Sequence, residues 1–357
     1  MSRVMIMAGG TGGHVFPALA VAAELRNRGV ALRWMGTASG IESRLVPAAD
    51  IELDIISVQG LRGKGLAGWL MAPFKLIKAV VEARRHIKAF QPQVVLGLGG
   101  FASGPGGIAA WLSRVPLVIH EQNAIAGLTN RLLAPFAKAV LLGFDNALSS
   151  AKARWVGNPV RAEIENIESP ATRYQQENKP LKLLVLGGSL GARSLNQTVP
   201  AALALMPKAE QPEVIHQCGE KHLTAARQAY QQAGVDADVK AFIEDMAAAY
   251  AAADLVICRA GALTVAEIAV AGVASVLVPF PYAVDDHQTA NAQVLTRSDA
   301  ALLIADSALQ ATDLANVISE LNDNRPRLRL MAERARAQAK TGSAAQIADI
   351  CMEQLDG

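Results

Sequence analysis

The chain has 357 residues, of which 51% are hydrophobic and 18% charged, a balance that predicts about two globular domains and excludes a disordered protein. Residues 1–160 carry 17 Lys/Arg and 8 Asp/Glu, whereas residues 161–357 carry 17 and 24, so only the first half is basic enough to face a polyanion. No apolar run reaches the roughly 18 residues of a membrane-spanning helix, and three widely separated cysteines argue against a disulfide framework and favour a reducing cytoplasm.

The first predicted elements are a short buried strand, a glycine-rich loop and a helix. The strand begins by residue 4, and we expect no room for a signal peptide before it. Gly9–Gly13 follows the strand, and Val15–Leu25 has apolar residues at helical spacing. Exposed backbone N–H groups at such a helix start form an anion site. His14 stands where the loop meets the helix, and its side chain can titrate near neutral pH.

Residues 62–90 form a basic, amphipathic stretch with seven Lys/Arg and one acid, Glu82. Its large apolar residues recur at intervals of three and four: Leu66, Trp69, Leu70, Phe74, Ile77 and Val81. This pattern predicts a helix that contacts an anionic lipid surface. The alternative is that the apolar face packs on a sheet and the charges are solvated. We find no recognised nucleic-acid motif in the stretch and expect no nucleic-acid partner.

Short apolar strands alternate with helical segments along the whole chain, which predicts α/β architecture with parallel sheets covered on both faces. The pattern restarts after the turn-like segment Val156–Arg161. We therefore expect two doubly wound, Rossmann-like domains, residues 1–160 and 161–357, facing a deep cleft, and the helical segment 325–354 can return to the first domain. The predicted strands are Val4–Met7, Leu32–Met35, Val94–Leu98, Leu117–His120, Ala139–Leu142, Leu183–Leu186, Glu213–Gln217, Val239–Phe242, Leu255–Cys258, Ser275–Val278 and Ala301–Ile304.

Glycine clusters follow several of these strands, at Gly9–Gly13, Gly97–Gly107, Gly187–Gly191 and Gly261. Their recurrence favours anion or sugar binding over simple turns. The dinucleotide fingerprint fails, because Val15 stands where its third glycine belongs and no acid directly follows the second strand. The G-x-x-x-x-G-K-[ST] loop is absent from the sequence.

The sequence His120-Glu-Gln-Asn123 closes a buried strand at its carboxyl end, where side chains point toward ligands in doubly wound sheets. Glu121 is a candidate base or orienting group, and Asn123 is a candidate ligand contact. The alternative is a buried network that only positions loops.

Two further loops follow strands in the second half. Thr264 is placed to donate to a phosphate at a helix start, and Glu267 to accept from both ribose hydroxyls, although the same pair also fits plain helix capping. In the segment 279–291, Gln288 is a candidate sugar contact. We expect no metal site at the adjacent residues 285–287, because neighbours in sequence rarely converge on one ion.

These motifs together resemble the MurG family of bacterial cell-wall glycosyltransferases. The resemblance covers nearly the whole chain and implies a GT-B fold, a metal-independent inverting transfer without a cofactor, and a peripheral position on the cytoplasmic face of the inner membrane. Its donor would be UDP-N-acetylglucosamine and its acceptor undecaprenyl-pyrophosphoryl-muramoyl-pentapeptide. The motifs in register are Gly9–His14, Gly60–Lys64, Gly99–Pro105, His120–Asn123, Gly157–Arg161, Gly187–Ala192 and Gly261–Glu267.

The resemblance also implies a set of donor contacts. In it, Ile243 would meet uracil through its backbone, Glu267 would bind ribose, and Ser189 with the Leu263–Thr264 turn would hold phosphate. The acceptor pyrophosphate would lie against the glycine loops of the first domain. The implied UDP-N-acetylglucosamine contacts are Thr11, Gly12, Gly13, Asn123, Arg161, Ser189, Ile243, Ala262, Leu263, Thr264, Val265, Ala266, Glu267 and Gln288.

An inverting transfer needs a base within about 3 Å of the acceptor hydroxyl. His14 is our first candidate for this base and Glu121 the second, because of their positions in the loops. Two other functions stay open at this point: a GT-B transferase with a soluble acceptor, and a UDP-sugar-binding regulator without catalytic activity.

Overall fold

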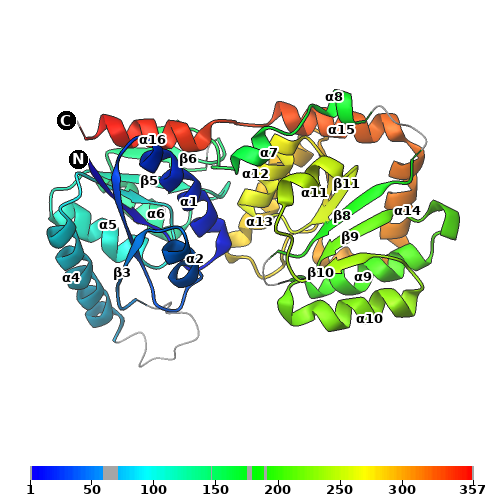
Figure 1. Cartoon of the computed structure of the whole chain (residues 1–357), viewed down its shortest axis with the longest axis horizontal. Helices are drawn as coiled ribbons and strands as arrows, with labels where there is room; N and C mark the ends of the chain where they lie inside the picture. Colours follow the sequence, from blue (N-terminus) through cyan, green and yellow to red (C-terminus); the bar gives the residue numbers. More distant parts are fainter. Residues whose placement is uncertain (1, 59–70, 146, 175–178, 189–190, 356–357) are drawn as a thin grey trace. The chain divides into compact units, whose positions relative to one another are not determined.

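The computed structural model describes residues 2–58, 71–145, 147–174, 179–188 and 191–355. The chain divides into two compact units (Figure 1). Unit 1 comprises residues 1–160 and 341–357, and unit 2 comprises residues 161–340. The last helix, Ser343–Glu353, therefore belongs to unit 1, in agreement with our expectation that the C-terminal helical segment can return to the first domain.

Unit 1 is built on a parallel sheet that has seven strands in the described residues, in the order β3-β2-β1-β4-β5-β6-β7. This order reverses beside β1, as in doubly wound folds, and places the carboxyl ends of β1, β4 and β5 side by side. The strands are β1 (Arg3–Met7), β2 (Ala31–Gly36), β3 (Glu52–Ile55), β4 (Val94–Gly97), β5 (Leu117–Glu121), β6 (Ala139–Leu142) and β7 (Ala153–Trp155).

Helices cover both faces of this sheet, because successive strand residues point to opposite sides. Val4 and Ile6 of β1 belong to a core with α1, α2 and α16, whereas Met5 and Met7 belong to a second core with α4, α5 and α6. The helices are α1 (Gly12–Asn27), α2 (Glu42–Ala48), α4 (Ala72–Phe90), α5 (Ser103–Leu112), α6 (Leu128–Leu133) and α16 (Ser343–Glu353), with a 3₁₀ turn at Ala134–Phe136.

Unit 2 repeats the architecture with a parallel sheet of order β10-β9-β8-β11-β12-β13, six strands in the part of the chain described. Its strands are β8 (Lys182–Leu186), β9 (Glu213–Gln217), β10 (Asp238–Lys240), β11 (Leu255–Cys258), β12 (Ala274–Leu277) and β13 (Ala301–Leu303). Its helices are α7 (Ala162–Glu165), α8 (Pro170–Arg173), α9 (Arg193–Ala204), α10 (Leu223–Ala233), α11 (Met246–Ala252), α12 (Ala262–Ala271), α13 (His287–Thr296), α14 (Ala311–Asp323) and α15 (Arg325–Ala337).

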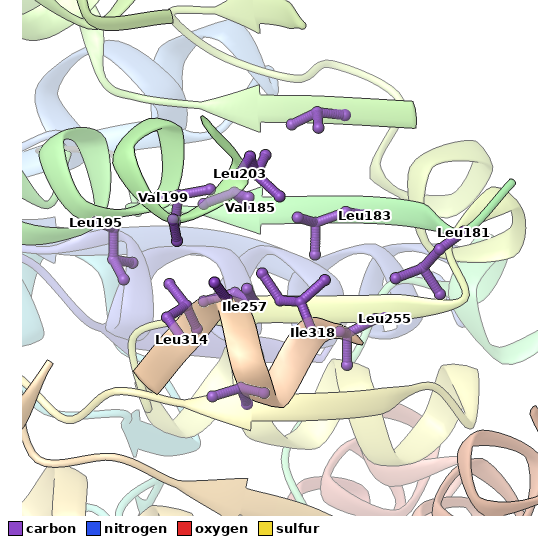
Figure 2. Packing of buried hydrophobic residues seen from close by; sticks show 14 of the residues in the cluster. Leu181, Leu183, Val185, Leu195, Val199, Leu203, Leu255, Ile257, Leu314 and Ile318 are labelled. Atoms are coloured by element: carbon purple, nitrogen blue, oxygen red, sulfur yellow. The ribbon is translucent and has the colours of Figure 1, made fainter. Parts of the chain in front are cut away.

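The core on one face of this second sheet is an aliphatic cluster (Figure 2). Leu183 and Val185 of β8 and Ile257 of β11 are buried against Val199 of α9 and Ile318 of α14. Burial of such side chains contributes about 1.5–3 kcal/mol each. The packing therefore fixes the strands whose carboxyl ends carry the candidate donor loops.

All eleven strands that the sequence predicts are confirmed within one or two residues. Two further strands, β3 and β7, were not predicted. Both lie at the edges of the first sheet and carry polar, partly exposed residues, so neither has the continuous apolar run of a central strand.

The amphipathic stretch 62–90 is confirmed as helix over Ala72–Phe90, and residues 59–70 lie outside the described residues, as do Leu66, Trp69 and Leu70 of the predicted stripe. Ala79 and Ala83 are buried on the side of this helix that packs against the rest of unit 1, chiefly α5, whereas Phe74 and Ile77 are 68% and 61% exposed. Among the described residues, we find no helix that is both long and apolar enough to cross a membrane.

His216 and its hydrogen-bond partners form a buried polar network in unit 2. Its Nε2 lies 3.0 Å from Asn196 Oδ1 and its Nδ1 lies 2.9 Å from the Tyr230 hydroxyl. Asn196 Nδ2 donates to the Cys218 carbonyl, so Asn196 Oδ1 faces the ring and accepts its proton. Burial lowers the pKa of His216 to about 4, and the ring is neutral at neutral pH.

We predict that this network makes stability depend on pH. The unfolded histidine binds a proton below pH 6.5 and the folded one only below about 4, so the network's contribution is complete above pH 6.5 and is lost as the pH falls toward 4. The loss amounts to about 3 kcal/mol. Urea unfolding of His216→Gln from pH 7 to 4.5 should show a flatter pH dependence than wild type, with His222→Gln as control. Equal slopes in all three proteins would contradict this.

Candidate functional site

The first glycine loop joins β1 to α1 at the carboxyl edge of the first sheet. Thr11 is the N-cap residue of α1 in extended conformation, and Gly12 and Gly13 form the first helical turn. Behind the loop, Trp34 Nε1 donates to the Ala8 carbonyl at 2.8 Å. The predicted residues Thr11, Gly12 and Gly13 thus present a helix N-terminus that suits an anion.

A buried carboxylate holds this loop from below. The side chain of Glu42 accepts from Gly10 N at 2.9 Å, from Thr37 N at 3.0 Å and from Thr37 Oγ1 at 2.7 Å. A Cβ on Gly9 would lie 2.5 Å from Glu42 Oε1, so any larger residue at this position would displace the Glu42 carboxylate from the loop. Glu42 was not identified from the sequence. In dinucleotide-binding folds an acid after the second strand binds a ribose, whereas the oxygens of Glu42 accept hydrogen bonds from Gly10 and Thr37.

The second glycine loop, after β4, packs directly on the first. Gly99 and Gly100 have φ of +91° and +84°, values that favour glycine. A Cβ on Gly100 would lie 2.2 Å from the Gly9 carbonyl oxygen, and one on Gly99 would lie 2.8 Å from His14 Nδ1. The two loops therefore meet backbone to backbone.

His14 lies half-buried in the first turn of α1, next to the loop that follows β5. Its Nδ1 is 3.2 Å from Gln122 Oε1. The structure thus brings together two of the predicted sequence motifs, Gly9–His14 and His120–Asn123.

His120 is fully buried behind this pair. Its Nε2 lies 2.9 Å from the Gly157 carbonyl, and its Nδ1 has no hydrogen-bond partner among the described residues. Burial lowers the pKa of His120 to about 4, against a smaller opposite effect of the bond to Gly157. His120 is therefore neutral at neutral pH and adds no positive charge beside His14.

Glu121, our second candidate base, has both oxygens occupied. Oε1 accepts from the backbone and side-chain nitrogens of Asn123 at 2.9 and 3.2 Å. Oε2 accepts from Gly127 N at 3.0 Å and from Asn130 Nδ2 at 2.8 Å. A buried carboxylate with four donors is suited to hold a loop, which is the alternative that the sequence left open. The same bonds place Asn123 at the edge of the first sheet.

In unit 2, the buried carboxylate of Glu267 lies in the second turn of α12. Glu267 Oε2 accepts from the hydroxyl of buried Tyr250 at 3.1 Å, and Glu267 Oε1 lies 3.4 Å from Arg161 Nη2. Burial raises the pKa of Glu267, while the charge of Arg161 and the Tyr250 bond act in the opposite direction. The predicted residues Arg161 and Glu267 are thus in contact, and Tyr250 was missed because it lies in an alanine-rich helix without a motif.

The start of α12 provides the helix N-terminus expected of a phosphate site. Gly261 is its N-cap residue in extended conformation, and Leu263 and Thr264 are partly exposed in the first turn. The predicted contacts Ala262, Val265 and Ala266 are buried, so only their backbone can serve a ligand.

Two further predicted donor contacts, Ile243 and Gln288, have hydrogen-bond partners within unit 2. Ile243 N donates to Gln217 Oε1 at 2.9 Å, and Gln288 Oε1 accepts from Phe280 N at 2.8 Å. Because the backbone N–H of Ile243 is already bonded to Gln217, the backbone contact to uracil that the resemblance implies is assigned to the Ile243 carbonyl oxygen. Ser189 lies outside the described residues.

Comparison with known proteins places this geometry in a family. The model of the glycosyltransferase family 28 N-terminal domain matches residues 4–142, and that of the C-terminal domain matches residues 182–349. The chain belongs to the MurG group of glycosyltransferase family 28. It is 55% identical to the UDP-N-acetylglucosamine–N-acetylmuramyl-(pentapeptide) pyrophosphoryl-undecaprenol N-acetylglucosamine transferase of Alkalilimnicola ehrlichii, over 98% of either chain. The protein of the same name from Chromohalobacter salexigens is also 55% identical, over 99% of this chain and 97% of the relative.

Solved structures agree with this membership. The crystal structure of MurG from Acinetobacter baumannii matches with a TM-score of 0.85 and 42% identity, over 99% of this chain and 100% of that chain. A UDP-GlcNAc 2-epimerase from Neisseria meningitidis matches with a TM-score of 0.67 at 12% identity, over 99% of this chain and 100% of that chain, which shows a shared fold alone. Two parallel-sheet domains and this membership establish the GT-B fold.

Arg259 is a positioning residue of this MurG family member that the sequence did not predict, because only its place after a strand marks it. Arg259 follows β11 and donates to the Val278 and Pro279 carbonyls at 3.1 Å, to Asp306 Oδ1 at 2.6 Å and to Ser194 Oγ at 2.9 Å. It thereby ties the start of α9 to the segment that follows β12 and leads into α13, the helix that contains Gln288. In the part of the chain described, no group of three His, Cys, Asp or Glu side chains is placed to hold a metal ion.

We predict that Glu121→Gln destabilises unit 1. The new amide nitrogen would face the donors Gly127 N and Asn130 Nδ2, and unsatisfied buried donors cost about 1–3 kcal/mol each. Urea unfolding at neutral pH should show a clear loss. Glu353→Gln, which breaks an exposed ion pair with Arg154 in the same unit, is the control and should have little effect. An unchanged midpoint for Glu121→Gln would refute the loop-anchor interpretation.

Proposed function

We propose that this chain transfers N-acetylglucosamine from UDP-N-acetylglucosamine to undecaprenyl-pyrophosphoryl-N-acetylmuramoyl-pentapeptide, a step of peptidoglycan synthesis. The observation that carries this is the identity of 51–55% to transferases of that name, over 97–98% of the length of the first three relatives. The two alternatives, a soluble acceptor and UDP-sugar binding without catalysis, share the fold but not this full-length likeness.

Unit 2 is suited to bind the donor. Glu267 can accept from ribose hydroxyls with the oxygen lone pairs that Tyr250 and Arg161 leave, and the backbone N–H groups at Leu263 and Thr264 can stabilise the diphosphate. As the bond between the sugar and the diphosphate breaks, negative charge grows on UDP. A helix N-terminus and the Arg161 guanidinium stabilise such charge without needing a metal.

Unit 1 is suited to bind the acceptor. Its net positive charge and its two glycine loops favour a pyrophosphate. The acceptor hydroxyl oxygen would attack the anomeric carbon of the donor sugar and give its proton to a base. His14 is that base in our proposal, because its ring adjoins the loops, whereas Glu121 is occupied by four donors.

A direct assay tests the function. Protein is incubated with labelled UDP-N-acetylglucosamine and the lipid-linked acceptor without added metal, and label is counted in the lipid fraction. Transfer supports the proposal. Donor binding without transfer to any acceptor would favour the regulator, and equal transfer to a lipid-free acceptor without vesicle binding would favour a soluble acceptor.

We predict that His14→Ala lowers kcat by about 10²–10⁴-fold, the usual contribution of a general base. The KM for UDP-N-acetylglucosamine should change far less, since the donor nucleotide is assigned mainly to unit 2. Steady-state kinetics with both substrates varied will measure this. If kcat stays near wild type, His14 is not the base.

We predict that Tyr250→Phe raises the KM for UDP-N-acetylglucosamine severalfold. Loss of the hydroxyl removes a bond that lowers the pKa of Glu267, so the carboxylate form is lost at a higher pH than in wild type. The rise in KM should therefore be larger at pH 6 than at pH 8. Tyr230→Phe, which removes a buried hydroxyl bonded to His216 in the same unit, is the matched control. A KM that rises equally in both variants would mean a general packing effect.

We also propose that the protein lies on the cytoplasmic face of the plasma membrane as a peripheral protein, held through α4. Phe74, Ile77 and Val81 are exposed on this helix among Lys75 and Lys78. An exposed apolar stripe flanked by lysines favours an anionic lipid surface.

The double variant Phe74→Ser/Ile77→Ser should lose sedimentation with phosphatidylglycerol vesicles, because it removes the apolar part of this contact. Leu205→Ser in unit 2, a variant at a residue 58% exposed, is the control and should sediment like wild type. Equal sedimentation of all three proteins would refute the contact through α4.

A further inference from the structure

A single buried amide connects three loops of unit 1. Gln122 follows β5, and its Nε2 donates to the Leu98 carbonyl at 2.7 Å, directly after β4. Its Oε1 lies 3.2 Å from Nδ1 of His14, in the loop and helix start after β1. These three strands are neighbours in the sheet, so one side chain reaches across their carboxyl ends.

The bond to Leu98 decides which way the Gln122 amide points. A backbone carbonyl only accepts, so the NH₂ group must face Leu98 and the amide oxygen must face the imidazole. An amide oxygen also only accepts, so His14 must carry a proton on Nδ1. In a neutral imidazole with its proton on Nδ1, the lone pair is on Nε2.

The surroundings leave this pair little freedom. A Cβ on Gly99 would lie 2.8 Å from His14 Nδ1 and 3.6 Å from Gln122 Oε1, so the second glycine loop closes over the bond. On the other side, Asn158 Nδ2 donates to the backbone carbonyl of Gln122 at 3.0 Å. Gln122 is itself only 2% exposed. Both ends of its side chain and its backbone are therefore held.

We propose that Gln122 is a positioning residue that keeps His14 in the tautomer with the proton on Nδ1 and the lone pair on Nε2. This rests on the proposed role of His14 as the base for the acceptor hydroxyl. The arrangement follows the logic of a catalytic triad, in which a third group orients the base, with a neutral amide in place of a carboxylate. Gln122 would act through His14 and touch neither substrate.

Ring nitrogen chemical shifts test the tautomer without any turnover. In the full-length protein labelled with ¹⁵N-histidine, long-range ¹H–¹⁵N correlation at a pH where the ring is neutral should show His14 protonated on Nδ1, with His14→Gln used for assignment. Gln122→Met removes the acceptor and should move His14 toward the Nε2–H form that histidine prefers in water. Gln122→Glu keeps an acceptor and should keep the Nδ1–H pattern. An Nε2–H pattern in wild type, or no change in Gln122→Met, would overturn the proposal.

Kinetics then test the consequence. Gln122→Met should lower kcat at least about tenfold, part of what a general base contributes, with the KM for UDP-N-acetylglucosamine within about twofold of wild type. Gln122→Glu should not restore kcat, because a carboxylate favours the imidazolium form of His14, which cannot accept a proton. Gln211→Met is the matched control, because it removes a side-chain amide bond to a carbonyl in unit 2, that of Leu203, and should leave kcat unchanged. A tautomer shift without a fall in kcat would overturn the proposal that Gln122 assists the reaction by positioning His14.

The two tests separate this proposal from the proposed function. If wild-type protein transfers no sugar, the function fails, while the ring shifts still decide whether Gln122 sets the tautomer of His14. If wild-type protein transfers sugar and His14 shows the Nε2–H form, only the role of Gln122 fails.

Discussion

The contact of two glycine loops, backbone against backbone, is the constraint on which the site of unit 1 depends. No side chain fits between them, since a Cβ on Gly100 would lie 2.2 Å from the Gly9 carbonyl oxygen. Because the loop after β4 comes this close to the loop after β1, the Leu98 carbonyl and the His14 ring both come within reach of Gln122. The glycines therefore serve two purposes: they leave backbone exposed to an anion, and they set the distance between the polar side chains.

The buried carboxylates of the two units differ in how completely the protein satisfies them. Glu42 and Glu121 each accept three or four bonds from loop backbone and neighbouring side chains, so they hold loops. Glu267 has Tyr250 at 3.1 Å and the partly exposed Arg161 at 3.4 Å as its described partners. Since a carboxylate has about four acceptor sites, Glu267 keeps capacity for ligand hydroxyls. This difference, rather than burial alone, is the reason that we propose Glu267, and not Glu42 or Glu121, as a ligand contact.

The sequence predicted the central strands and the glycine loops because their signals are local. Continuous apolar runs mark strands buried on both faces, whereas the edge strands β3 and β7 have no such run. The roles of Glu42 and Gln122 could not be predicted, because they depend on contacts 32 and 108 residues away in the chain. Helix α4 was predicted as amphipathic, but the spacing alone could not say that Ala79 and Ala83 pack inward while Phe74 stays exposed. Close helix packing selects small residues, and that choice belongs to the tertiary structure.

A neutral orienting group suits a base that works beside phosphates. A carboxylate in the position of Gln122 would favour the imidazolium form of His14 before any substrate arrives, and a protonated ring cannot accept a proton. The amide fixes the same tautomer without that charge, and His120 behind it is neutral as well. In the proposed reaction, the negative charge that stabilises the imidazolium then comes from the acceptor pyrophosphate, which we assign to the glycine loops of unit 1. The ring would then become a better base when the acceptor is bound, which couples proton removal to acceptor binding.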